Sequence, residues 1–63
     1  MIKEYRIKRG LTLEQLAEKC EISWRNLQRI ENGNYKKAKF ETVAKIIIEL
    51  EIKESDIIKL IKE

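Results

Sequence analysis

Apolar residues recur along this chain at intervals of three and four, the spacing that places them on one face of an α-helix. The chain contains no proline and no alternating run of apolar and polar residues of the kind that forms a strand. The pattern therefore predicts an all-α fold. The five predicted helices cover residues 2–9, residues 12–20, residues 23–32, residues 40–50 and residues 54–62.

Capping residues mark the ends of the first three predicted helices. Gly10 follows the first helix, at the position where glycine commonly ends a helix. The sequence TLEQ, beginning at Thr12, fits a capping box, with a hydroxyl at the N-cap and glutamine three residues later. Ser23 is a good N-cap for the third helix, which we expect to end near Gly33. The segment after it, NYKKAK, is predicted to be a basic loop.

The length of the chain and its single cysteine limit the possible functions. Sixty-three residues predict one domain over residues 1–63, with a marginal core that buries only about 60% of the unfolded surface. Because the chain has no histidine and only Cys20, we expect no internal disulfide, no metal and no cofactor. No nucleophile has a base at hand, so we expect no enzymatic activity. Self-association or compact helix packing must then stabilise the fold.

Two further features concern the compartment and the charge. A single free thiol fits a reducing cytosol, and no apolar run is long enough for a membrane span or a signal peptide. Residues 1–39 hold ten Lys and Arg against five Glu, a net of +5, whereas residues 40–63 hold four Lys against six acids, a net of −2. This separation indicates two surfaces with different roles, and the basic one favours a polyanion. Ordinary solubilising charge is the alternative explanation.

The predicted third helix has an unusual polar face. At about 100° per residue, Leu27 and Ile30 define its inward side. Five residues fall on an arc that faces away: Trp24, Arg25, Gln28, Arg29 and Asn32. These are the side chains that read base edges, since Arg suits guanine, Gln and Asn suit adenine, and an aromatic ring offers an apolar contact. Glu31 falls beside Leu27 on the inward side, which is unusual for a carboxylate.

The spacing around this helix is that of a helix-turn-helix. The small Ala17 allows one helix to cross the next closely, and a three-residue turn follows at positions 21–23. Leu27 and Ile30 then anchor the second helix. The chain accordingly resembles the phage-repressor/Cro (Xre-type) helix-turn-helix family. The sequences LTLEQLAEKCEIS and LQRIENG carry the resemblance, supported by EYRIKRGLT before them and FETVAKIIIEL after them.

The resemblance implies a compact five-helix, lambda-repressor-like DNA-binding domain and a sequence-specific transcriptional regulator, expected to be a repressor. It implies base contacts by four residues of the third helix: Trp24, Arg25, Gln28 and Arg29. It implies DNA backbone contacts by a second group: Thr12, Asn32, Asn34, Tyr35, Lys36, Lys37 and Lys39. It also implies an ion pair between Arg6 and Glu31, which would give the inward carboxylate a partner. The expected partner is double-stranded DNA, bound by a homodimer on a two-fold operator, in a bacterial or phage-encoded protein of the cytoplasm and nucleoid.

Three positions depart from the family pattern. Glu21 occupies a turn position where the family prefers glycine, and Glu51 raises the same question. A non-glycine residue with positive φ at either position costs roughly 1 kcal/mol. Leu13 replaces a frequent polar residue, so one phosphate contact is expected to be missing.

Several residues keep two interpretations at this stage. Trp24 either meets a thymine methyl or a sugar, or packs back on the preceding helix. Cys20 is expected in the core rather than as a redox sensor, because buried cysteine behaves as a small hydrophobe. Tyr5 is expected at the edge of the core rather than in a ligand contact.

The expected dimer and the expected function each have one alternative. An exposed apolar set usually marks a contact surface, and we expect a dimer interface built from Ile48, Ile58, Leu60 and Ile61. Alternatively, the last helix uses its aliphatic residues to cover its own core. The alternative function is a protein-interaction module on the same fold, such as an antitoxin, an anti-repressor or an adaptor.

Overall fold

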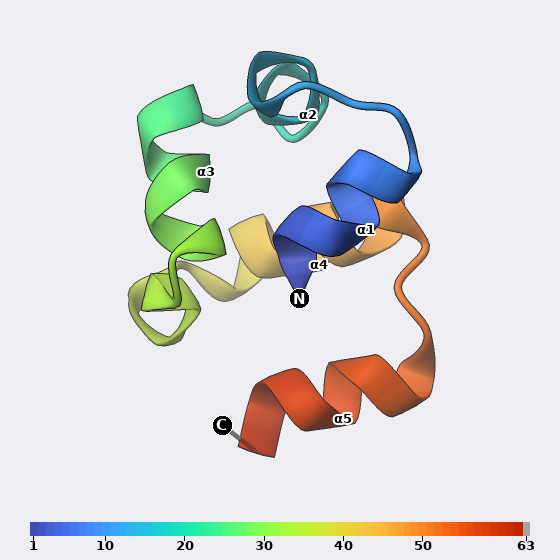
Figure 1. Cartoon of the computed structure of the whole chain (residues 1–63). Helices are drawn as coiled ribbons and strands as arrows, with labels where there is room; N and C mark the ends of the chain where they lie inside the picture. Colours follow the sequence, from blue (N-terminus) through green and yellow to red (C-terminus); the bar gives the residue numbers. More distant parts are fainter. Residues whose placement is uncertain (63) are drawn as a thin grey trace.

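Six helical segments follow one another in the computed structural model, which describes residues 1–62 and all of their side chains except those of residues 35, 36, 61 and 62. They are α1 (Ile2–Lys8), α2 (Leu13–Lys19), α3 (Trp24–Glu31), the one-turn 3-10 helix η1 (Asn34–Lys37), α4 (Phe40–Leu50) and α5 (Glu54–Lys62). Every regular element of the described residues is helical, as the sequence predicts. In Figure 1, α2 and α3 lie at one end of the molecule and α5 lies at the other, after an extended link from α4.

The predicted caps begin α2 and α3. The backbone N–H of Gln15 donates to Thr12 Oγ1 at 3.0 Å, and the backbone N–H of Thr12 donates to Gln15 Oε1 at 2.9 Å, which completes the capping box. The backbone N–H of Asn26 donates to Ser23 Oγ at 3.1 Å. Each bond satisfies an N–H group that the first turn of a helix leaves without an intrahelical partner. Local sequence therefore sets where both helices of the helix-turn-helix pair begin.

Two segments differ from the sequence prediction. Helix α1 ends at Lys8, one residue earlier than expected, with Arg9 as its C-cap. The segment predicted as a basic loop contains the 3-10 turn η1. Gly33 precedes this turn with φ 103°, a conformation that glycine adopts without steric cost. The chain can therefore leave α3 sharply and form a short 3-10 turn, which is common beside α-helix ends.

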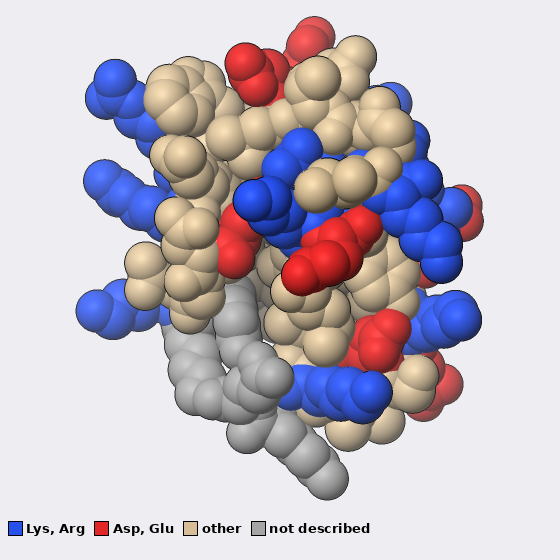
Figure 2. Space-filling view, in the orientation of Figure 1, with Lys and Arg blue, Asp and Glu red and all other residues tan. Residues whose placement is uncertain are grey.

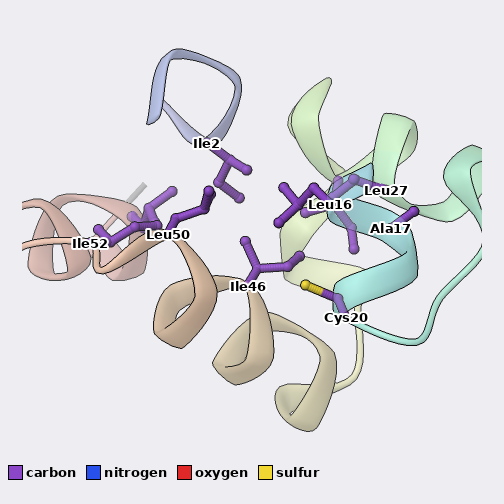
Figure 3. Close-up of a cluster of buried hydrophobic side chains, with 10 residues drawn as sticks. Ile2, Leu16, Ala17, Cys20, Leu27, Ile46, Leu50 and Ile52 are labelled. Carbon is purple, nitrogen blue, oxygen red and sulfur yellow. The ribbon is translucent and has the colours of Figure 1, made fainter. Parts of the chain in front are cut away.

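The core lies where α1, α2, α3, α4 and α5 converge (Figure 3). Ten residues are buried in it: Ile2, Leu16, Ala17, Cys20, Leu27, Ile30, Ile46, Leu50, Ile52 and Leu60. Fully burying one Leu or Ile side chain contributes about 1.5–3 kcal/mol. The two α3 members, Leu27 and Ile30, are 0% and 2% exposed, so they attach that helix to the rest of the fold.

Burial decides the interpretation of two residues. Cys20 is fully buried, and burial raises the pKa of its thiol, so the thiolate that oxidation requires is disfavoured. Leu60, expected at a dimer interface, is only 7% exposed and belongs to the core of its own chain. It lies three residues after Ile57, which also packs against that core, so both occupy the inner face of α5. For Leu60, this burial agrees with the alternative in which the last helix covers its own core.

The two non-glycine turn positions have positive φ, as anticipated: 58° at Glu21 and 51° at Glu51. Arg9 supports the second of these turns. Its Nε donates to the carbonyl oxygen of Leu50 at 3.1 Å, and its guanidinium lies 3.4 Å from the Glu51 carboxylate. A basic side chain that reaches the last carbonyls of a helix satisfies acceptors that have no intrahelical donor. Arg9 thus stabilises the corner between α4 and α5.

Tyr5 attaches α1 to α5. Its hydroxyl donates to the Asp56 carboxylate and accepts a hydrogen bond from the backbone N–H of Lys53 at 3.3 Å. The bond to Asp56 raises the pKa of Tyr5, because the carboxylate favours the protonated phenol. Tyr5 is half-buried and packs against the core, so it lies at the core edge.

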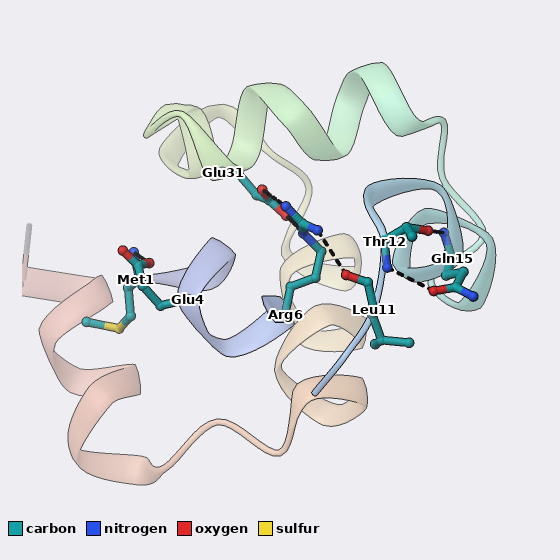
Figure 4. A network of polar contacts seen from close by, with 7 residues as sticks. All are labelled: Met1, Glu4, Arg6, Leu11, Thr12, Gln15 and Glu31. Atoms are coloured by element: carbon teal, nitrogen blue, oxygen red, sulfur yellow. Dashed lines mark hydrogen bonds and ion pairs between the residues drawn. The ribbon is translucent and has the colours of Figure 1, made fainter. Parts of the chain in front are cut away.

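An ion pair joins α1 to α3. Arg6 Nε lies 2.7 Å from Glu31 Oε2, and Arg6 Nη2 lies 3.3 Å from Glu31 Oε1. Arg6 Nη1 also donates to the carbonyl oxygen of Leu11 at 2.9 Å (Figure 4). The side chains of Arg6 and Glu31 are 12% and 5% exposed. The inward-facing carboxylate of α3 therefore has a partner that binds both of its oxygens.

We expect Arg6→Met and Glu31→Gln each to lower the free energy of unfolding by about 3–5 kcal/mol. The reason is that removing one partner of a buried pair leaves the other without its counter-ion. Urea and thermal unfolding measure the loss. Lys45→Gln is the control, because Lys45 lies 3.5 Å from a Glu21 side chain that is 77% exposed, and such surface pairs contribute at most about 1 kcal/mol. Two pair variants as stable as the control would contradict this assignment.

We expect Glu21→Gly to be more stable than Glu21→Ala by roughly 0.5–1 kcal/mol, because only glycine avoids the steric cost of a left-handed conformation. Both variants lose the same contact with Lys45, so the comparison isolates the backbone. Urea unfolding of the two variants measures the difference. An alanine variant of equal or greater stability would show that the turn is not strained.

Candidate nucleic-acid interface

Helix α3 presents its polar side outward because its two aliphatic residues face the core. Leu27 and Ile30 are buried, whereas five neighbouring side chains are exposed: Trp24, Arg25, Asn26, Gln28 and Arg29. The four residues expected to contact bases therefore lie together on one accessible face. Trp24 is 45% exposed, so this residue is partly covered by the protein and partly accessible.

The outward face of α3 carries no carboxylate. The first turn of the helix has no acidic residue, and Glu31, in the last turn, bonds to Arg6 instead. In Figure 2, blue side chains project from the edge of the molecule where α3 and η1 lie, and no red side chain projects there. A surface with cations and amides but no acids attracts a polyanion and can bond to its acceptor groups.

The residues expected to contact the DNA backbone lie at the ends of helices. Thr12 is the N-cap of α2, Asn32 is the C-cap of α3, and Lys39 is the N-cap of α4. Asn34 and Lys37 begin and end η1, and all five side chains are exposed. The expected contacts by Tyr35 and Lys36 fall on side chains outside the described set. The five described side chains thus come from the ends of four different elements.

A hollow of about 250 Å³ lies between α3 and η1. Six residues line it: Asn26, Arg29, Ile30, Asn34, Lys37 and Ala38. It brings Arg29, expected to reach a base, beside Lys37, expected to reach a phosphate. Asn26 was not among the expected site residues. Its place on α3 between Arg25 and Leu27 puts it at the margin of the outward arc, so helical spacing alone did not single it out.

Trp24 and Arg25 contact each other at the start of α3. The central carbon of the Arg25 guanidinium lies 5.4 Å from the centroid of the Trp24 ring, within the range of a cation–π interaction. Helical spacing did not predict this contact, because neighbouring residues of a helix do not normally face each other. The indole therefore has a partner on the same outward face.

A model of the helix-turn-helix family matches residues 2–57, most of the chain. The chain belongs to the helix-turn-helix family. This agrees with the five-helix architecture and makes the protein a DNA-binding helix-turn-helix regulator, of the type that the Xre/Cro resemblance implies. Comparison with curated proteins and with solved structures found no match.

The helix-turn-helix domain also exposes an apolar surface, on α4 and α5. Ile48 and Ile58, both expected at a dimer interface, are 73% and 47% exposed. Ile61 falls outside the described side chains. Phe40, at the start of α4, is 85% exposed and was not expected there. The sequence contained one indication that Phe40 belongs to this surface. Phe40, Ala44 and Ile48 are four residues apart each time, and such residues share one helix face.

A hollow of about 470 Å³ accompanies this surface, lined by Ala38, Phe40, Val43, Ala44, Ile47, Ile48, Ile57 and Leu60. The lining is aliphatic or aromatic throughout. A contiguous apolar surface of this kind on a small domain commonly marks a site of protein contact. Among residues 1–62, no helix has both the length and the apolar character needed to cross a membrane.

Proposed function

We propose that this helix-turn-helix protein is a sequence-specific transcriptional repressor that reads the major groove with residues 23–32. The observation that carries the proposal is the acid-free, exposed polar face of α3 beside its buried aliphatic anchors. A major groove about 12 Å wide admits an α-helix, and each base pair presents a distinct pattern of donors and acceptors there. Repression follows when the bound protein occupies DNA that the transcription machinery requires.

The proposed contacts divide into two groups with different chemistry. Arg25 and Arg29 present fork-shaped donors that suit the O6 and N7 atoms of guanine, and Gln28 suits the N6 and N7 atoms of adenine. Lys37, Lys39 and the polar residues at the helix ends contact phosphates, which fixes the register of α3 but carries no sequence information. The described members of both groups are exposed, as either kind of contact requires.

We propose that the repressor binds as a homodimer on a two-fold operator. The exposed side chains of Ile48 and Ile58, with Phe40 nearby on α4, supply the surface that supports this. Helix-turn-helix dimers place two recognition helices one turn of duplex apart, so the half-sites should lie about 10 base pairs apart. Ile61, expected at the same interface, remains part of the proposal.

We expect Arg29→Ala or Gln28→Ala to weaken binding to the preferred operator by about 1–3 kcal/mol per half-site and to relax preference at one base pair. Lys37→Ala should weaken binding to all sequences alike and flatten the salt dependence by roughly 0.9 for each lost contact. In a two-fold dimer, the loss of binding free energy and the change in salt dependence both double. Binding to operators that carry every single-base change, at two salt concentrations, separates the two behaviours.

The same measurement tests the alternative. If Arg25, Gln28 and Arg29 can all be replaced without a change in sequence preference, α3 does not read the DNA. A protein-interaction module on this fold then becomes the better account. Lys37→Ala is the control within the experiment, because it changes affinity without changing preference.

We expect Ile48→Lys to abolish paired binding without unfolding the protein. Ile48 is 73% exposed, so a charge there should change stability by no more than about 0.5 kcal/mol while disrupting an apolar interface. Sedimentation of the free protein and of its operator complex measures the number of copies bound. Ile7→Lys is the matched control, since Ile7 is an exposed isoleucine on α1 that does not line the apolar hollow of α4 and α5. A wild-type monomer that saturates a single half-site would contradict the dimer.

A further inference from the structure

The geometry of α3 points to a more specific preference: we propose that Trp24 and Arg25 together read a thymine and a guanine on neighbouring base pairs. This inference rests on the proposed function, because it requires α3 to lie in the major groove. It begins from the contact between the two side chains, which helical spacing does not predict.

The guanidinium carbon of Arg25 lies over the Trp24 ring, and a cation–π contact leaves the N–H donors of the guanidinium unused. A guanidinium that stacks on an aromatic face keeps its N–H donors in its own plane, where they remain free for hydrogen bonds. Arg25 can therefore stay against the indole and still present its fork to the O6 and N7 acceptors of guanine. Stacking also restrains a long side chain that would otherwise be ordered only on binding.

The indole has one apolar counterpart in the major groove. Among the four bases, only thymine presents a methyl group there. Trp24 is the first residue of α3, and the N-terminal residues of a recognition helix are those that contact base edges. Trp24 is 45% exposed, so part of the residue is accessible to a base.

The separation of the two groups limits the relation of the two bases. Base pairs are stacked at about 3.4 Å, and two steps span roughly 6.8 Å. The guanidinium carbon and the ring centroid lie 5.4 Å apart, more than one step and less than two. Side chains held at that separation meet base pairs that are at most two steps apart. We take the shorter relation, one dinucleotide step, with the methyl on one base pair and the guanine on the next.

Deoxyuridine tests this inference because it differs from thymidine only by the missing methyl. The operator is first selected from random DNA with the wild-type protein, and each thymine in it is then replaced singly by deoxyuridine. We expect binding to weaken about fourfold at one thymine in each half-site, the value of one buried carbon. Trp24→Ala should remove this sensitivity, whereas Arg29→Ala should retain it. Arg25→Ala should relax preference for a guanine on the adjacent base pair.

Controls address folding and the position of the ring. Trp24→Phe retains an aromatic face and should keep part of the deoxyuridine effect, while thermal unfolding compares all variants with the parent. Trp24 is the single tryptophan of the chain, so its fluorescence reports this site alone. Its emission should differ between complexes with the thymine operator and with the deoxyuridine operator.

Three results would overturn the inference. The first is a wild-type protein that is insensitive to deoxyuridine at every thymine. The second is a sensitivity that survives Trp24→Ala. The third is a Trp24→Ala variant that weakens all sequences alike, which assigns the ring to a sugar. In each case, base preferences that still depend on Gln28 and Arg29 would leave the proposed function intact.

Discussion

The ion pair between Arg6 and Glu31 is the constraint on which the orientation of the exposed polar face of α3 depends. Helix α3 has only two buried aliphatic residues, so apolar packing alone leaves its rotation weakly defined. The bidentate contact to Arg6 adds a polar attachment, and the same guanidinium holds the carbonyl oxygen of Leu11, just before α2. One side chain thus positions α1, the start of α2 and α3. Because desolvation offsets much of the attraction in such pairs, orientation is its main contribution.

Much of the fold was predictable because its signals are local. Thr12 and Ser23 cap α2 and α3 as their side-chain chemistry predicts, and α4 and α5 have the predicted bounds, residues 40–50 and 54–62. The 3-10 turn at 34–37 was missed because a polar basic segment has no apolar periodicity. Its form follows from the backbone at Gly33, whose φ the sequence alone does not give.

The candidate site was predictable in its outward face but not in its side-chain contacts. Helical spacing separates the core side of α3 from the polar side, and burial agrees with that separation. Spacing did not tell which aliphatic residues of α5 are buried, nor that Phe40 of α4 is exposed. The cation–π contact between Arg25 and Trp24 is likewise a matter of side-chain conformation, which consecutive positions on a helix do not specify.

The surface expected to contact DNA and the exposed apolar surface are adjacent in the sequence. Lys39, an expected phosphate contact, is followed directly by Phe40, the most exposed of the large apolar residues described on the domain. The exposed apolar residues Phe40, Ile48 and Ile58 are few beside the roughly 20–30 residues that each partner contributes to a typical stable interface. On adjacent half-sites, however, two copies would be held at an effective concentration in the millimolar range, where a weak contact suffices. Under the proposed function, DNA would therefore supply the proximity that the apolar surface lacks. Sequence preference would then depend on half-site spacing as well as on the bases that α3 reads.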